Sequence, residues 1–158
     1  MRGQKAYRGA VEGSRLVEAP GPRVCALSDI GTGRERNEDA FFVSADASLL
    51  AVADGLGGHV AGEVAATVAV EAAIEHIENS GARLCSPRGL KNLLAESFVV
   101  ADVAVKALGR RRPELRGMAT TLVVALIRRG RLHLCHVGDV RAYLLKPAGL
   151  GQLTRDHS

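Results

Sequence analysis

The stretch LLAVADGLGGHVAGE, residues 49–63, sets the fold around it. Its first five residues are apolar and Asp54 follows them, which predicts a buried strand over residues 49–54. Gly55, Gly57 and Gly58 then interrupt the pattern. Residues 61–77 carry apolar side chains at three- and four-residue spacing, as one face of a helix does. A carboxylate is therefore expected where a buried strand ends and a glycine-rich turn leads into a helix.

The segments on either side extend this pattern into one domain. Strands are expected at 24–31 and 40–45 before this stretch, and a second helix at 88–108 after it. A polar connector, 109–117, leads to strands at 120–127, 132–139, 141–145 and near 152–154. Three strands, two helices and then three or four strands indicate an α+β fold with antiparallel strands and grouped helices. Residues 1–22, rich in glycine, proline and charge, are expected to form a flexible basic leader to a domain over 23–158.

Composition excludes several classes of protein. The net charge is +4, but residues 1–23 hold five Lys or Arg against two Glu, so the predicted domain is almost neutral, unlike a nucleic-acid binder. Three cysteines without close pairs argue against a disulfide framework or a zinc site and fit a reducing cytoplasm. No apolar run approaches the roughly 18 residues of a membrane span. We therefore expect a cytoplasmic protein with neither nucleic acid nor membrane as partner.

Two segments carry candidate metal ligands. A carboxylate at a buried strand end is costly to leave unpaired, so Asp54 is expected to bind a cation or hydrogen-bond donors. The glycines after it allow a ligand to approach the backbone, so the Gly55 carbonyl is a second oxygen for a hard cation such as Mg²⁺ or Mn²⁺. The alternative is that Asp54 caps the helix. Residues 34–39, RERNED, place Arg34 beside Glu38 and Asp39; the alternative there is a solvated loop.

Two further residues are candidates on weaker grounds. His59 precedes the helix beside a carboxylate-rich loop, where an imidazole suits a general acid; the alternative is a surface or capping residue. Asp139 follows a glycine between two strands, and a simple hairpin turn is a fair alternative for it.

Taken together, the motifs resemble a known family. RxxNED, ADGxGGHxAGE, GMATTLVVAL, VGDVRAYLL and LTRDHS resemble, in order and spacing, the motifs of the PPM family, the type 2C metal-dependent protein phosphatases. The Asp-Gly-Leu-Gly-Gly-His form at 54–59 is most similar to the bacterial branch. The resemblance runs from about Val24 to Ser158 and implies the N-terminal part of a catalytic domain. The implied fold is a four-layer α-β-β-α sandwich of antiparallel sheets, incomplete at its C-terminus.

The resemblance implies hydrolysis of phosphoserine and phosphothreonine in proteins by a metal-bridged hydroxide. Two Mn²⁺ or Mg²⁺ ions are implied, held by Asp54, Gly55 and Glu38, with Asp39 supporting them. Arg34 is similar to the residue that grips the substrate phosphate, and His59 to the general acid. Asp139 resembles the ligand of a third, weaker metal, with Asp156 a further candidate. Substrates would be phosphoproteins made by Ser/Thr kinases. Thr120 and Thr121 also match a family motif and are interpreted as packing residues.

The sequence departs from the family pattern at two places. Val140 stands where the family has serine in Gly-Asp-Ser-Arg, which changes a local hydrogen bond. The family's later Ser-Asp-Gly and Asp-Asn motifs, whose aspartates complete the metal pair, have no counterpart before Ser158. We therefore expect weak metal binding and poor turnover from these 158 residues alone.

Two other functions remain as alternatives. A non-catalytic phosphatase-like module would bind a phosphoprotein or another partner without turnover. A cysteine-based phosphatase is suggested by CHVGDVR, in which Arg141 follows Cys135 at the spacing of a phosphate loop. The Asp inside that loop would repel phosphate, which argues against the second alternative.

Overall fold

A computed structural model describes residues 7–9, 13–17, 24–56, 60–81 and 86–157. Its main sheet has the order β1-β4-β5-β7-β8, with β6 paired to the end of β5, and every pairing is antiparallel. The strands are β1 (Tyr7–Gly9), β4 (Asp39–Val43), β5 (Leu49–Leu56), β6 (Ala119–Thr120), β7 (Leu122–Arg128) and β8 (Arg131–Val137). The apolar strand β5 lies at the centre of this sheet, as its sequence indicates.

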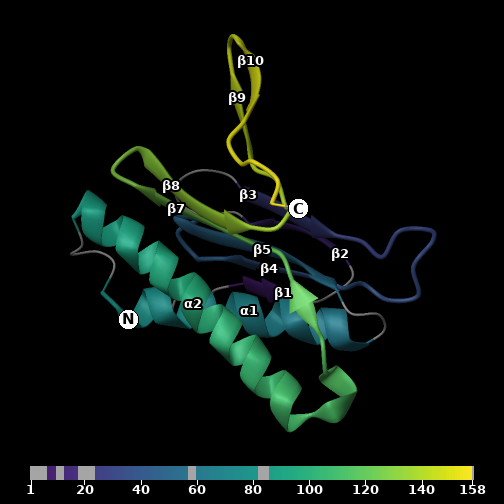
Figure 1. Cartoon of the computed structure of the whole chain (residues 1–158). Coiled ribbons are helices and arrows are strands. Elements are labelled where there is room, and N and C mark those ends of the chain that lie inside the picture. The colour runs from purple at the N-terminus through teal and green to yellow at the C-terminus, as the bar shows by residue number, and fades with distance from the viewer. Residues whose placement is uncertain (1–6, 10–12, 18–23, 57–59, 82–85, 158) are drawn as a thin grey trace.

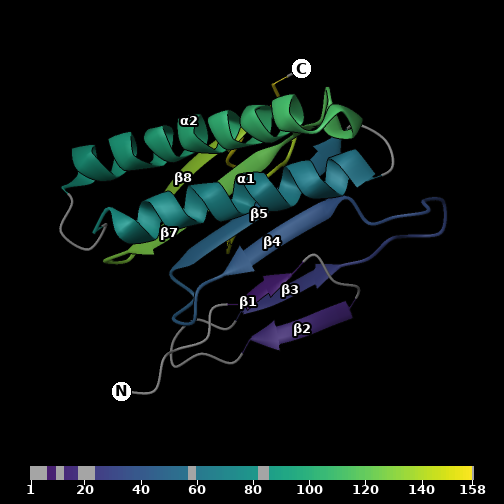
Figure 2. The ribbon, with the colours of Figure 1, turned by 90° about the horizontal axis from the view of Figure 1, so that it is seen from below.

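Two antiparallel helices cover one face of the main sheet (Figure 2). They are α1 (Val60–Asn79) and α2 (Pro87–Arg111). Helix α1 buries Ala65, Ala69 and Ala73 completely or nearly so, and these small side chains let its backbone lie close to the sheet. Helix α2 begins where the Ser86 hydroxyl accepts a hydrogen bond from Gly89 N, 3.2 Å away, and Pro87 occupies the first turn. The core lies between these helices and the sheet.

Shorter pairs of strands lie outside the main sheet. β2 (Gly13–Val17) pairs with β3 (Val24–Ser28), and the pair lies on the side of the main sheet that faces away from the helices (Figure 2). β9 (Tyr143–Lys146) and β10 (Gly149–Gln152) form a hairpin that projects from the body (Figure 1). A short 3₁₀ helix, η2 (Pro113–Leu115), connects α2 to β6.

The expected α+β class with antiparallel sheets is confirmed, and the chain contains the helix layer and the first sheet of the expected sandwich. Three local expectations differ from the structure. Strands β1 and β2 lie within residues 1–22, because β4 and β3 supply their backbone partners. Strand β5 continues through Gly55 to Leu56, since β6 pairs with it there. The last strand is 149–152 rather than 152–154, after a turn at 147–148.

The division into a leader and one domain stays a prediction. Among the described residues, no helix is both long enough and apolar enough to cross a membrane.

Candidate active site

Two aspartates face each other at one end of the central strand pair, β4 and β5, of the main sheet. β4 pairs with β5 so that Asp39 lies directly opposite Asp54. Side chains opposite each other on antiparallel strands share a face, and like charges in such a pair are destabilising. Burial and the neighbouring Asp54 raise the pKa of Asp39, Glu38 adds to this, and Arg34 opposes it. The strand pairing thus concentrates negative charge at one point.

Glu38 is held against the first turn of α1. Its side chain is only 12% exposed, and its Oε2 lies 3.9 Å from Arg34 Nη1. A Cβ placed on Gly62 would lie 2.7 Å from both Cδ and Oε2 of Glu38, so only glycine leaves room for this carboxylate. The N-terminal turn of a helix carries partial positive charge, which favours a carboxylate at this place.

The end of β5 packs backbone to backbone against the same helix turn. Gly55 N donates a hydrogen bond to Glu38 O at 3.0 Å. A Cβ on Gly55 would lie 2.0 Å from Gly62 O, which no side chain tolerates. Gly55 and Gly62 together therefore allow Glu38, Asp54 and the start of α1 to meet. The role of the Gly55 carbonyl as a metal ligand stays a prediction.

Two threonines hold the backbone of Asp54. Asp54 N donates to Thr121 Oγ1 at 2.9 Å, and Thr121 N donates to Asp54 O at 2.9 Å. The Thr120 hydroxyl also donates to Asp54 O, at 2.9 Å. The interpretation of these threonines as packing residues is therefore incomplete: Thr121 is buried, but both hydroxyls fix the peptide groups of a candidate ligand.

The turn that carries Asp139 rests on Thr121. Gly138 has a φ of +88°, and a Cβ there would lie 2.7 Å from Thr121 Cγ2. Because Leu122 pairs with Val137, this turn lies at the end of the sheet where Thr121 holds Asp54. Asp139 is exposed, and its role as a weaker metal ligand stays a prediction.

Asp156, the further candidate ligand, has another partner. Both of its carboxylate oxygens accept hydrogen bonds from Arg141, with Nε–Oδ1 at 2.9 Å, and this lowers the pKa of Asp156. His136 Nε2 lies 2.8 Å from Arg155 O, and the rings of His136 and His157 stack at 4.5 Å. These contacts tie the segment 153–157 to the Asp139 turn, so Asp156 holds the chain rather than offering free oxygens.

Several expectations are changed by the geometry. Asp54 is exposed rather than held inside the sheet end, because it lies on the face of β5 away from the helices. Its alternative role as a helix cap is wrong, since Asp54 lies within β5 and α1 begins at Val60. The Arg34 side chain is 75% exposed. His59 lies outside the described residues.

The cysteine-phosphatase alternative does not fit the structure. Cys135 lies within strand β8, opposite Val124, and not in a loop. Burial raises the pKa of its thiol, whereas a nucleophilic cysteine needs a lowered one.

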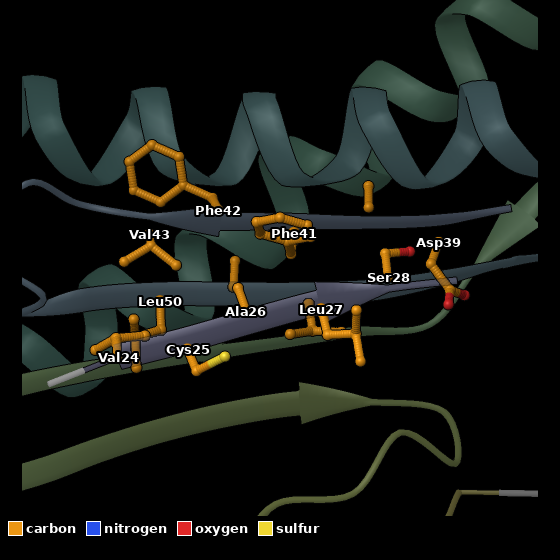
Figure 3. A pocket seen from close by; sticks show the side chains of 13 residues that line it. Val24, Cys25, Ala26, Leu27, Ser28, Asp39, Phe41, Phe42, Val43 and Leu50 are labelled. Carbon is orange, nitrogen blue, oxygen red and sulfur yellow. The ribbon is translucent and has the colours of Figure 1, made fainter. Parts of the chain in front are cut away.

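A cavity of about 270 Å³ lies between β3 and the main sheet (Figure 3). Its lining is mostly apolar and includes Val24, Leu27, Phe41 and Val52. Asp39 and Ser28 lie together at one end of it, where the apolar surroundings account for the partial burial of Asp39 (Figure 3). Such an apolar lining does not suit a phosphate group, so the carboxylates remain the candidate site and this cavity does not.

The candidate donors fit a hard divalent cation in their chemistry. Glu38, Asp39, Asp54 and the Gly55 carbonyl offer oxygen only, which Mg²⁺ and Mn²⁺ prefer. Across the described part of the chain, no three His, Cys, Asp or Glu side chains are close enough together to hold an ion as they stand. The candidate site therefore offers suitable oxygen donors near one another, but the described side chains do not form a complete coordination sphere.

Sequence reasoning missed two residues that shape the site, Asn37 and Gly62, and did not indicate the role of a third, Thr121. Asn37 Nδ2 donates to Ser28 Oγ at 2.6 Å, and Asn37 Oδ1 accepts from Asp39 N at 3.0 Å, so it anchors the loop before β4. Gly62 makes room for Glu38, and Thr121 holds Asp54. The signal for Asn37 was its place inside RERNED, while the contacts of Gly62 and Thr121 join segments far apart in the sequence.

Comparison with known proteins agrees with this fold. The family profile described as Protein phosphatase 2C matches residues 30–157. The serine/threonine protein phosphatase PstP of Mycobacterium tuberculosis is 42% identical over 137 residues, which cover 85% of this chain and 25% of PstP. The chain therefore belongs to the protein phosphatase 2C family.

Solved structures of bacterial phosphatases superpose on most of the chain. The catalytic domain of PstP in complex with two manganese ions matches with a TM-score of 0.70 at 33% identity, covering 96% of this chain and 56% of that one. Serine/threonine phosphatase Stp1 from Staphylococcus aureus matches with a TM-score of 0.74 at 28% identity, covering 100% and 59%. The chain thus spans a quarter of PstP and somewhat more than half of the solved domains.

Proposed function

We propose that this chain is a catalytic part of a metal-dependent phosphatase that hydrolyses phosphoserine and phosphothreonine in proteins. The observation that carries the proposal is the pairing of Asp39 with Asp54, with Glu38 beside them. Two aspartates facing each other at a cost to the fold, with a third carboxylate nearby, support a site for cations. Membership of the protein phosphatase 2C family supports the same conclusion.

The ions would be Mn²⁺ or Mg²⁺, because the donors are all oxygens. Asp54, the Gly55 carbonyl and Glu38 would hold two ions with support from Asp39, and Asp139 would serve a third, weaker site. Bound there, the ions would supply a hydroxide nucleophile at neutral pH. The two manganese ions in the PstP complex support this choice of metal.

Other residues would handle the phosphate and the leaving group. The exposed planar fork of Arg34 suits two phosphate oxygens, and its weak 3.9 Å contact with Glu38 leaves it available. His59 would donate a proton to the serine or threonine oxygen as the P–O bond breaks. Thr120 and Thr121 would keep Asp54 in place while this happens.

The substrates would be phosphoproteins made by Ser/Thr kinases in the cytoplasm. The exposed Cys25 and half-buried Cys135 are free thiols, which fits a reducing compartment.

A second candidate is a module that binds phosphoproteins without turning them over. It is favoured by one observation: the described carboxylates form no three-ligand cluster. Two divalent ions carry four positive charges against three carboxylates here, so we expect weak metal binding and low turnover from the chain as it stands.

A hydrolysis assay distinguishes these functions. Phosphate release from a phosphothreonine peptide would be measured with added Mn²⁺, with a chelator, and after alkylation with iodoacetamide. We expect release that requires Mn²⁺ and survives alkylation. Peptide binding with no release at any Mn²⁺ concentration would establish the binding module instead, and release that survives the chelator would refute the metal mechanism.

A further inference from the structure

A basic cleft lies between the end of α2 and η2. It has a volume of about 490 Å³. Buried Val105, Leu115 and Met118 contribute apolar lining, while Lys106, Arg110 and Arg116 contribute the positive charges. An apolar floor with a charged border fits a peptide segment better than a single small ion.

The arginines around this cleft are not neutralised by acidic partners among the described residues. Between Arg110 and Arg116 the chain has four arginines and one glutamate, a net charge of +3. All four arginines are exposed, and over the described ranges none of them forms an ion pair, whereas Lys106 is paired with Asp102 at 2.8 Å. Basic residues in the last turn of a helix complement its dipole, which accounts for Arg110 and Arg111. Arg112 and Arg116 lie beyond the helix, so the dipole does not explain them.

The cleft is close to the carboxylate site. Arg116 precedes Thr120 by four residues, so their Cα atoms are at most about 14 Å apart even in a fully extended chain. The Thr120 hydroxyl donates to the Asp54 carbonyl, so this length joins the cleft to the candidate metal site. Figures 1 and 2 both show the end of α2 and η2 beside the first turn of α1, where β5 ends.

We propose that this basic cleft, defined by Lys106, Arg110 and Arg116, binds an acidic segment of the phosphoprotein substrate. The proposal rests on the proposed function for the identity of that substrate. Guanidinium groups pair with carboxylates through two parallel hydrogen bonds, and the unpaired arginines have these donors free. An extended peptide advances about 3.3 Å per residue. The limit of about 14 Å from Arg116 to Thr120 corresponds to about four residues, and the arginine side chains and the step from Thr120 to the carboxylates add to it. The preferred Asp or Glu residues should therefore lie within about six positions of the phosphorylated residue.

The test compares two charge-neutralising variants. Arg110→Gln/Arg116→Gln removes two charges from the cleft. Arg129→Gln/Arg131→Gln removes two charges from the β7–β8 turn, at the opposite end of the strands, and is the matched control. Thermal melting by circular dichroism confirms that both variants fold. Fluorescence anisotropy then measures binding of a phosphothreonine peptide with a Glu-Asp-Glu segment five positions away, its uncharged Gln-Asn-Gln counterpart, and the unphosphorylated acidic peptide.

We expect the acidic peptide to bind about tenfold more tightly than the neutral one at low salt, since each exposed ion pair contributes up to several-fold. The Arg110/Arg116 variant should lose this preference, while the control variant keeps it. High salt should also remove it, because exposed pairs are screened. Equal binding of the two peptides, or an equal loss in both variants, would overturn the proposal. So would equally tight, Arg110/Arg116-dependent binding of an oligonucleotide of the same length, which would mark a general polyanion surface.

The same measurements separate this proposal from the proposed function. Selective binding of the unphosphorylated acidic peptide, lost in the Arg110/Arg116 variant, supports the cleft even if no phosphate is released. Mn²⁺-dependent release of phosphate that is indifferent to flanking charge would refute the cleft and leave the phosphatase function standing.

Discussion

Replacing Gly62 with alanine tests whether the start of α1 positions Glu38 for a metal ion. The added Cβ would lie 2.7 Å from Cδ and Oε2 of Glu38, and 3.1 Å from the Gly55 carbonyl carbon. Ordinary van der Waals contacts of a Cβ begin near 3.4 Å. The Glu38 carboxylate is the flexible partner, so it would be displaced by about 0.7 Å, the difference between these two distances.

The two effects of this change have opposite signs. Alanine within a helix is favoured over glycine by about 1 kcal/mol, which offsets the cost of moving Glu38. For a chain of this size, that gain corresponds to about 2–4 °C in melting temperature. A misplacement of about 1 Å at a reacting centre costs on the order of a hundredfold in rate. We therefore expect a melting temperature within about 3 °C of the parent, with Mn²⁺ affinity and turnover lowered by about tenfold or more.

A double-mutant cycle provides the control. If Gly62 acts through Glu38, then Gly62→Ala in a Glu38→Ala background should raise the melting temperature by the helix gain and leave Mn²⁺ affinity unchanged. Calorimetry of Mn²⁺ binding and thermal melting are the measurements. A drop in melting temperature well beyond 3 °C with unaltered Mn²⁺ affinity would show that the tight contact serves the fold alone.

The remaining predictions concern Arg34, Thr121 and Asp39. Arg34→Ala should raise KM for a phosphopeptide severalfold and change the melting temperature by less than about 2 °C, because its side chain is 75% exposed; a large loss of stability with KM unchanged would contradict this. Thr121→Val leaves the Asp54 N–H without its acceptor, so it should cost about 1–3 kcal/mol in urea unfolding, while Thr121→Ser should retain most of the stability. Burial and the neighbouring Asp54 raise the pKa of Asp39 above its ordinary value of 3.8. Protonated Asp39 therefore stabilises the fold below pH 3.8, and this stabilisation is lost as the pH rises through the raised pKa. Asp39→Asn should therefore raise the melting temperature of the metal-free chain at pH 7 by about 1–3 °C, from the cost of like charges facing across strands, and the gain should shrink towards pH 4. A lowered melting temperature at pH 7 would refute this.

Much of the fold was readable from local patterns. The succession of an apolar run, glycines and a helical repeat predicted β5 and α1. Such a succession can be read from neighbouring residues alone, because side-chain hydrophobicity and glycine content are local properties of the sequence. Strands β1 and β2 were missed because their backbone partners lie in β4 and β3, and their own residues do not have a strand pattern.

The candidate site was predicted in part. The sequence indicated Glu38, Asp39 and Asp54 as a group, and the strand register brings the two aspartates face to face. It did not indicate Gly62 or the role of Thr121, because each acts through a contact with a distant segment. The exposure of Asp54 also depends on which face of β5 is covered, and that is a property of the whole sheet.

The alanine face of α1 has a consequence for substitutions far from any ligand. Ala65, Ala69 and Ala73 set how closely the helix lies on the sheet, and Gly62 lies in the first turn of the same rigid helix. A larger side chain at one of these positions would act as a wedge and tilt the helix, since packed interiors transmit strain. Its first turn would then move against Glu38. The effect of such a substitution on metal affinity would resemble long-range regulation. Its cause, however, would be only a larger distance between α1 and the sheet.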